Sequence, residues 1–110
     1  MDKVTWPAGK ADIQAPAYVA ELNISVWNNK TILNPEQLTG NMTIDLDISA
    51  QMRPGAELIV KLNTAGTETT SFGTGIQAPD IVGVAGKTKV QAFVFDGVDF
   101  IATGTPMQID

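Results

Sequence analysis

The chain has no cysteine and no histidine, and these two absences remove several kinds of chemistry at once. Without cysteine there is no thiolate nucleophile, and without either residue the usual zinc sites cannot be built. Histidine is also the side chain most often used for proton transfer near neutral pH. We therefore expect a protein that is not an enzyme and that holds no metal ion and no cofactor.

Long apolar runs and clusters of basic residues are absent as well. No segment approaches the roughly 18 apolar residues of a membrane span, and no basic start leads into an apolar signal region. Seven Lys and Arg against 12 Asp and Glu leave a formal net charge of -5. Because basic side chains on phosphates supply most of the affinity for nucleic acids, we expect neither a nucleic-acid nor a membrane partner. We also expect a chain that is made in the cytoplasm and not exported.

What is present is the composition of one folded domain, with 44% hydrophobic and 17% charged residues in a chain of 110. Residues 1–17, "MDKVTWPAGKADIQAPA", hold two prolines and a glycine and show no sustained period. Regular alternation of apolar and polar residues begins at Tyr18. We predict an extended N-terminal arm at residues 1–17 and a β-sandwich domain at residues 18–110, with a disordered start as the alternative for the first segment.

Alternation with a period of two continues through most of residues 18–110 and is clearest in residues 42–48, "MTIDLDI". Residues 57–62 and 67–72 are predicted to form a hairpin, and residues 34–40 are compatible with one helical turn. Strands joined by short turns predict an all-β fold. Its expected form is a single-domain antiparallel β-sandwich, jelly-roll-like, with about seven or eight strands.

An Asp-Gly pair lies between two apolar runs in residues 92–104, "AFVFDGVDFIATG". If Asp96 and Gly97 are the central residues of a type I′ turn, the flanking strands place four apolar side chains on one face. The turn alone then accounts for Asp96, which we interpret as a structural residue and not as a metal ligand or catalytic carboxylate. The predicted core residues of this hairpin are Phe93, Phe95, Val98 and Phe100.

Four pieces follow one another between residues 42 and 108. They are "TIDLDI", "PGAELIVKLNTAGTETTSFGTGIQAP", "GVAGKTKVQAFVFDGVDFIATG" and "PMQ". In this layout the chain resembles a β-rich domain of tailed-bacteriophage structural proteins. Such domains occur in head fibres, in head decoration or auxiliary proteins and in tail appendages, and the resemblance implies a crAss-like phage of gut bacteria as the source. The resemblance carries over no functional residue.

This resemblance implies a non-enzymatic virion protein at the capsid surface, either a capsid decoration or auxiliary subunit or a head-fibre subunit. Its expected partners are the phage capsid protein and copies of itself, in a homo-oligomer such as a trimer. Exposed apolar side chains usually mark a partner surface. The expected assembly contacts are therefore Trp6 and Ile13 in the arm, together with Trp27.

Two other functions are compatible with the residues. A small carbohydrate-binding β-sandwich module would use exposed aromatic side chains, and the candidates are Trp6, Tyr18 and Trp27. An enzyme with paired carboxylates would need two acids in one cleft. Asp45 and Asp47 share the polar face of a strand without the spacing of a calcium loop, so a solvated acidic face is the better interpretation.

Overall fold

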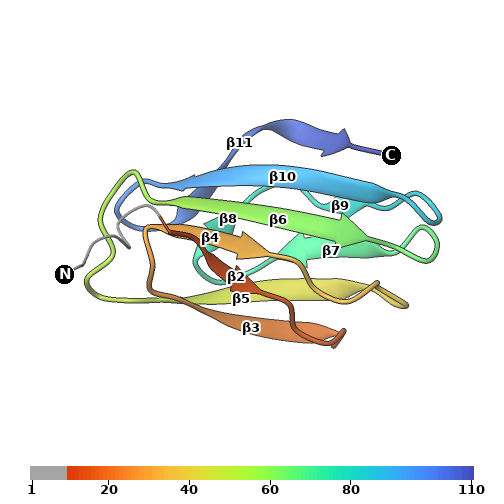
Figure 1. The fold of residues 1–110 in the computed structure, drawn as a ribbon, viewed down its shortest axis with the longest axis horizontal. Helices are drawn as coiled ribbons and strands as arrows, with labels where there is room; N and C mark the ends of the chain where they lie inside the picture. Colours follow the sequence, from red (N-terminus) through yellow and green to blue (C-terminus); the bar gives the residue numbers. More distant parts are fainter. Residues whose placement is uncertain (1–9) are drawn as a thin grey trace.

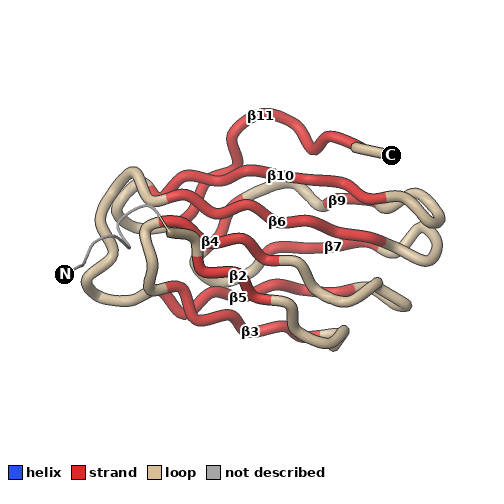
Figure 2. Tube along the Cα trace, in the orientation of Figure 1, coloured by secondary structure: helices blue, strands red, loops and turns tan. Residues whose placement is uncertain are grey.

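A computed structural model describes residues 10–110. In this range the chain forms ten strands, β2 to β11, and no helix, so none that could cross a membrane. The strands form two sheets, a six-stranded sheet in the order β2-β4-β6-β10-β11-β8 and a four-stranded sheet in the order β3-β5-β7-β9. The two layers can be followed in Figure 1, and Figure 2 shows the loops that connect them. The prediction of an all-β fold is confirmed.

The strands are short, and most lie between two turns. The six-stranded sheet contains β2 (Asp12–Gln14), β4 (Lys30–Leu33), β6 (Glu57–Asn63), β10 (Thr88–Phe95), β11 (Phe100–Gln108) and β8 (Ile76–Gln77). The four-stranded sheet contains β3 (Glu21–Val26), β5 (Met42–Ile48), β7 (Thr69–Phe72) and β9 (Ile81–Val82).

Successive strands from β2 to β10 alternate between the two sheets, so the chain winds around one axis. Each sheet is entered again after a full turn, and the neighbours β2 and β4, β4 and β6, β3 and β5, and β5 and β7 are therefore parallel. The expected antiparallel pairing throughout is wrong, because most turns carry the chain to the other sheet instead of to a hydrogen-bonded neighbour. This winding resembles a β-solenoid more than a jelly roll, and the jelly-roll-like form is not confirmed.

The antiparallel pairs of the described residues are β7 with β9, β6 with β10, and β10 with β11, and each includes a strand that begins at Ile81 or later. The predicted hairpin of residues 57–62 and 67–72 does not form, since β6 and β7 lie in different sheets. Residues 34–40 form no helical turn, and Leu38 instead makes an isolated parallel bridge to Thr64.

One apolar core lies between the two sheets. Alternate side chains of β3, β5 and β6 point inward, as the period of two requires. The pattern is complete in β3, where every second residue is buried. Phe72 of β7 and Phe93 of β10 meet edge to face across the core, with ring centroids 5.4 Å apart. Contacts of this kind hold the sheets together as one unit.

The β10–β11 hairpin has a register different from the predicted one. Phe95 pairs with Phe100, and Asp96 N–H donates to the Asp99 carbonyl at 3.0 Å, so the turn is centred on Gly97 and Val98. Val98 is 75% exposed, which corrects its prediction as a core residue. Gly97 has a φ of 106°, a conformation that glycine adopts without a steric penalty. Phe93, Phe95 and Phe100 are buried.

The segment predicted as an arm is described from residue 10 onward, so Trp6 lies outside the described residues. Residues 12–14 form β2, which lies parallel to β4 at the edge of the six-stranded sheet. Two further backbone bonds, from Asn34 N–H to the Gln14 carbonyl and from Glu36 N–H to the Pro16 carbonyl, are both 2.8 Å long. Residues 12–16 are thus hydrogen-bonded to the fold.

Candidate functional site

Trp27 is the exposed aromatic side chain around which the candidate site is built. The alternation of exposed and buried side chains in β3 ends at Val26, which is fully buried. Trp27 is the next residue and lies just beyond the strand. Trp27 is 62% exposed. An indole ring in water leaves a large apolar surface uncovered, and such surfaces often serve to bind a ligand or partner.

A turn directly after Trp27 fixes its position. Asn29 N–H donates to the Asn28 side-chain oxygen at 2.7 Å, the local bond by which asparagine stabilises a turn. The Asn28 amide donates to the Lys10 carbonyl at 2.9 Å and so joins this turn to the start of the described chain. β4 begins at Lys30.

The loop between β5 and β6 forms the other side of the site. Two close turns shape it, through bonds from Met52 N–H to the Ser49 carbonyl at 3.0 Å and from Ala56 N–H to the Arg53 carbonyl at 3.3 Å. The parallel winding brings this loop beside the first turn, because Glu57 N–H donates to the Asn29 carbonyl at 3.0 Å.

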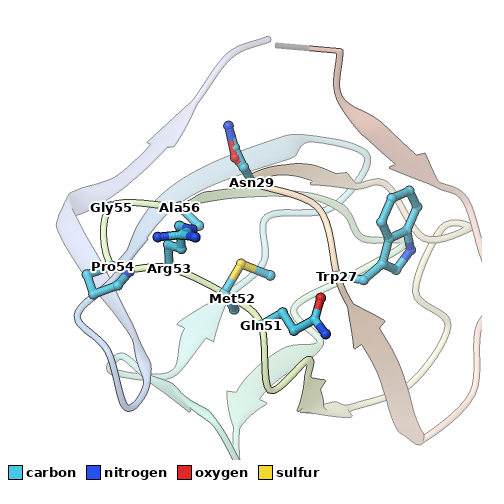
Figure 3. A pocket seen from close by; sticks show the side chains of 8 residues that line it. All are labelled: Trp27, Asn29, Gln51, Met52, Arg53, Pro54, Gly55 and Ala56. Atoms are coloured by element: carbon cyan, nitrogen blue, oxygen red, sulfur yellow. The ribbon is translucent and has the colours of Figure 1, made fainter. Parts of the chain in front are cut away.

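An open hollow of about 530 Å³ lies between these two segments. Figure 3 shows Trp27 on one side of it, Arg53 and Pro54 on the other, and Gln51 and Met52 between them. The complete lining consists of Trp27, Asn29, Gln51, Met52, Arg53, Pro54, Gly55 and Ala56.

A second hollow, of about 380 Å³, also has Trp27 in its wall. Its other residues are Lys10, Ala11, Asp12 and Asn28. Trp27 is therefore shared by two adjoining depressions of the surface, one with the cation Arg53 and one with charges of both signs.

The acidic residues form no comparable site. Residues 10–110 contain no group of three or more acidic side chains placed to hold a metal ion. Asp45 accepts a bond from Thr74 N–H at 2.7 Å and is half-buried on β5, while Asp47 is exposed on the same strand. Asp96 lies in the β10–β11 turn, where the N–H groups of Asp99 and then Val98 lower the pKa of its carboxyl.

The residues expected to contact partners lie near one another where they are described. Ile13, on the edge strand β2, is 67% exposed, and its neighbour Asp12 lines the second hollow beside Trp27. Tyr18 is different, because its ring is half-buried and its hydroxyl donates to the Asn41 carbonyl at 2.8 Å.

The sequence did not predict that the hollow beside Trp27 is lined by Asn29, Gln51 and Arg53. The Pro54-Gly55 pair did signal a turn, and Trp27 before two asparagines signalled the end of a strand. Nothing in the pattern indicated that the two turns meet, because that depends on the parallel pairing of β4 with β6.

Comparisons of this chain with family models, curated proteins and solved structures find no match.

Proposed function

We propose that this chain is a non-enzymatic structural subunit of a phage virion, a capsid decoration or auxiliary protein or a head-fibre subunit, that assembles as a homo-oligomer on the capsid. The resemblance of residues 42–108 to β domains of such proteins supports the virion assignment. The observation that carries the assembly is the open edge of β3. We also propose that the two sheets pack on each other as in a β-sandwich. The one cluster of buried apolar side chains in residues 10–110 supports this packing.

β3 is the outermost strand of its sheet, and β5 is its one neighbour in the described part of the chain. Thr43 N–H donates to the Ala20 carbonyl, and Ser49 N–H to the Val26 carbonyl, both at 2.8 Å. Even-numbered residues therefore turn their backbone groups toward β5. Since these directions alternate along a strand, the odd-numbered residues turn theirs toward the open edge.

The odd-numbered residues of β3 are Glu21, Asn23 and Ser25. Within residues 10–110, one bond reaches their open side, from the Gln14 amide to the Ser25 carbonyl at 3.0 Å. A carbonyl oxygen has a second lone pair, so this bond leaves Ser25 able to accept another. β3 presents a short ladder of backbone donors and acceptors to a further strand.

The edge has few of the features that usually prevent strand addition, because β3 has six residues, contains no proline, lysine or arginine, and carries one charged side chain, Glu21. The β3 strand of a second copy of the chain can pair with this edge. An antiparallel pair of β3 strands centred on Asn23 places Asn23 opposite its own copy and Glu21 opposite Ser25 of the other chain. Like charges then do not meet, and the buried faces of the two sheets continue into each other.

A proline at position 23 tests this assembly. Asn23 turns its N–H away from β5, so Asn23→Pro removes a donor of the open edge and leaves the internal ladder in place. We expect the natural chain to sediment as an oligomer and Asn23→Pro as a monomer with a retained thermal transition. Asn23→Thr, which keeps the N–H and suits a strand, is the matched control and should remain oligomeric.

A monomeric natural chain, or an oligomer that persists in folded Asn23→Pro, would contradict assembly through β3. Co-sedimentation with purified capsids of a crAss-like phage tests the virion assignment separately. Absence of any association with the capsids, by an oligomer that forms normally, would contradict it.

A further inference from the structure

We propose that Trp27 and the hollow beside it form a carbohydrate-binding site, in which a sugar ring stacks on the indole and its hydroxyls bond to the surrounding amide and guanidinium groups. This site is not needed for strand pairing at β3 and does not depend on that assembly. It would give the subunit an affinity for a glycan.

Trp27 supplies the aromatic surface of the proposed sugar site. A sugar ring has an apolar face of C–H groups and an edge of hydroxyls, so it can cover an indole without burying its own polar atoms. Binding sites for small molecules commonly combine such an apolar surface with a few well-placed polar groups. With 62% of its surface exposed, Trp27 offers the apolar part.

The polar half is supplied by Asn29, Gln51 and Arg53, which line the same hollow. In the described chain the side chains of these three residues make no hydrogen bond and no ion pair. An amide both donates and accepts, and a guanidinium donates from a planar fork, so together they match the donors and acceptors of adjacent sugar hydroxyls. Figure 3 shows Gln51 between Trp27 and Arg53, so polar groups follow the hollow from the indole toward its far side.

The walls of the hollow are held by the fold itself. Gly55 N–H donates to the Phe95 carbonyl at 2.8 Å, and Gly55 has a φ of 97°, which suits the sharp turn after Pro54. Met52 packs partly against the core. A site that exists before the ligand arrives loses less conformational entropy on binding.

The second hollow indicates a chain of sugars instead of a single ring. It lies against the same Trp27 and adds Lys10, Asp12 and the Asn28 turn. An oligosaccharide could place one unit in each depression, with the indole between them. The charges along this path are one carboxylate and two cations, so both neutral and acidic glycans belong in the test.

The probes are cellohexaose, chitohexaose, xylohexaose, mannohexaose and hexagalacturonic acid, titrated into the full chain. Calorimetry gives the affinity, and indole fluorescence in a Trp6→Phe background reports Trp27 alone, because the chain has two tryptophans. We expect at least one probe to bind and to shift the Trp27 emission. Trp27→Ala should weaken that binding roughly tenfold or more, as the loss of an aromatic anchor does.

Three further variants sharpen the result. Arg53→Ala and Gln51→Ala should each weaken binding several-fold, and Trp27→Tyr should retain part of the affinity because it keeps a ring. Val82→Ala is the matched control, since Val82 is a half-exposed apolar residue of β9 outside both hollows. It should leave the affinity unchanged.

Two outcomes would overturn the proposal. One is that no probe binds at about 10 mM, a concentration at which even millimolar affinities are seen. The other is that binding survives Trp27→Ala unchanged. If Trp27→Ala instead abolishes oligomerisation and no probe binds, Trp27 is a subunit contact and the sugar site is wrong, while the test at Asn23 still judges assembly through β3 by itself.

Discussion

The rings of Phe95 and Phe100 lie opposite each other across the β10–β11 ladder, with centroids 5.1 Å apart and planes inclined at 35°. Both side chains are buried, and Phe100 has no exposed surface. In the register predicted from the Asp-Gly pair, Phe95 would face Val98 instead. The observed register joins two large aromatic side chains in the core and leaves the smaller Val98 in the turn.

Replacing Phe100 should therefore have a large effect on stability. Phe100→Ala removes a fully buried ring and should lower the free energy of unfolding by about 3 to 5 kcal/mol, measured by urea titration. Val98→Ala, two positions away in an exposed turn, should change it by less than about 0.5 kcal/mol. A loss below about 1 kcal/mol for Phe100→Ala would show that this side chain is not part of the core.

Gln91 is a buried polar residue at an irregular point in the strand pairing of the same hairpin, a bulge. The register of β10 with β11 shifts between Val90 and Ala92, and the Gln91 amide donates to the carbonyls of Ala92, Thr103 and Gly104 at 3.0, 3.3 and 3.3 Å. Gln91→Leu has a similar size but supplies no donor. We expect it to lower the free energy of unfolding by about 1 to 3 kcal/mol, as buried carbonyls left without a partner do.

Hydrogen exchange measures where this loss occurs. In Gln91→Leu the amides of β11 beyond Gly104 should exchange faster than in the natural chain, because the bulge loses its central bonds. Gln108→Leu, an exposed change on the same strand, should leave exchange near the bulge unaltered. An equally stable Gln91→Leu would mean that the amide contributes nothing to the bulge.

The sequence predicted which side chains are buried better than which strands are neighbours. Alternation in residues 21–26 and 42–48 correctly places one face of each strand in the core, since burial depends on local period alone. Pairing depends on where each turn leads the chain, and a turn such as Asn28-Asn29 has the same composition whether it joins neighbours or crosses between sheets. The parallel winding could not be predicted for this reason.

The candidate site shows the same limit. The sequence nominated Trp27 and Ile13 as apolar residues that contact partners, and each is well exposed. It could not predict a role for Arg53 or Gln51 in the site, because these residues line the same hollow as Trp27 only through the pairing of β4 with β6. The Asp-Gly pair was informative about a turn but not about its centre, because the side chain of Asp96 bonds to the N–H groups of Val98 and Asp99.

Two buried threonines offer a route to greater stability. Among residues 10–110, the hydroxyls of Thr31 and Thr70 have no hydrogen-bond partner, and the two residues are almost fully buried. Thr31→Val and Thr70→Val replace an unpaired polar atom with a methyl group of nearly the same shape, so each should raise the free energy of unfolding by about 1 kcal/mol. Urea titration measures the change.

Thr64 is the control for these two substitutions. It is also buried, but its hydroxyl donates to the Val84 carbonyl at 3.1 Å. Thr64→Val removes a bond that exists and should lower the free energy of unfolding by about 1 kcal/mol. If Thr31→Val were destabilising to the same extent as Thr64→Val, the Thr31 hydroxyl would have a partner after all.

The carboxylate of Asp96 should make a pH-dependent contribution to stability. Its Oδ1 accepts bonds from Asp99 N–H at 2.9 Å and from Val98 N–H at 2.8 Å, and these bonds lower its pKa from the ordinary value of 3.8. A carboxyl whose pKa is lower in the folded state stabilises that state above the unfolded pKa. The contribution is lost as the pH falls through that value toward the folded pKa.

Asp96→Asn isolates this effect, because asparagine keeps an oxygen at the same place but does not titrate in this range. The natural chain should be slightly more stable than Asp96→Asn at about pH 7, and the difference should shrink as the pH falls below about 4. Urea titration of both chains at several pH values measures this difference, and the titration of all other carboxyl groups cancels between them. A difference that stayed constant or grew on acidification would show that the two turn bonds do not favour the ionised form of Asp96.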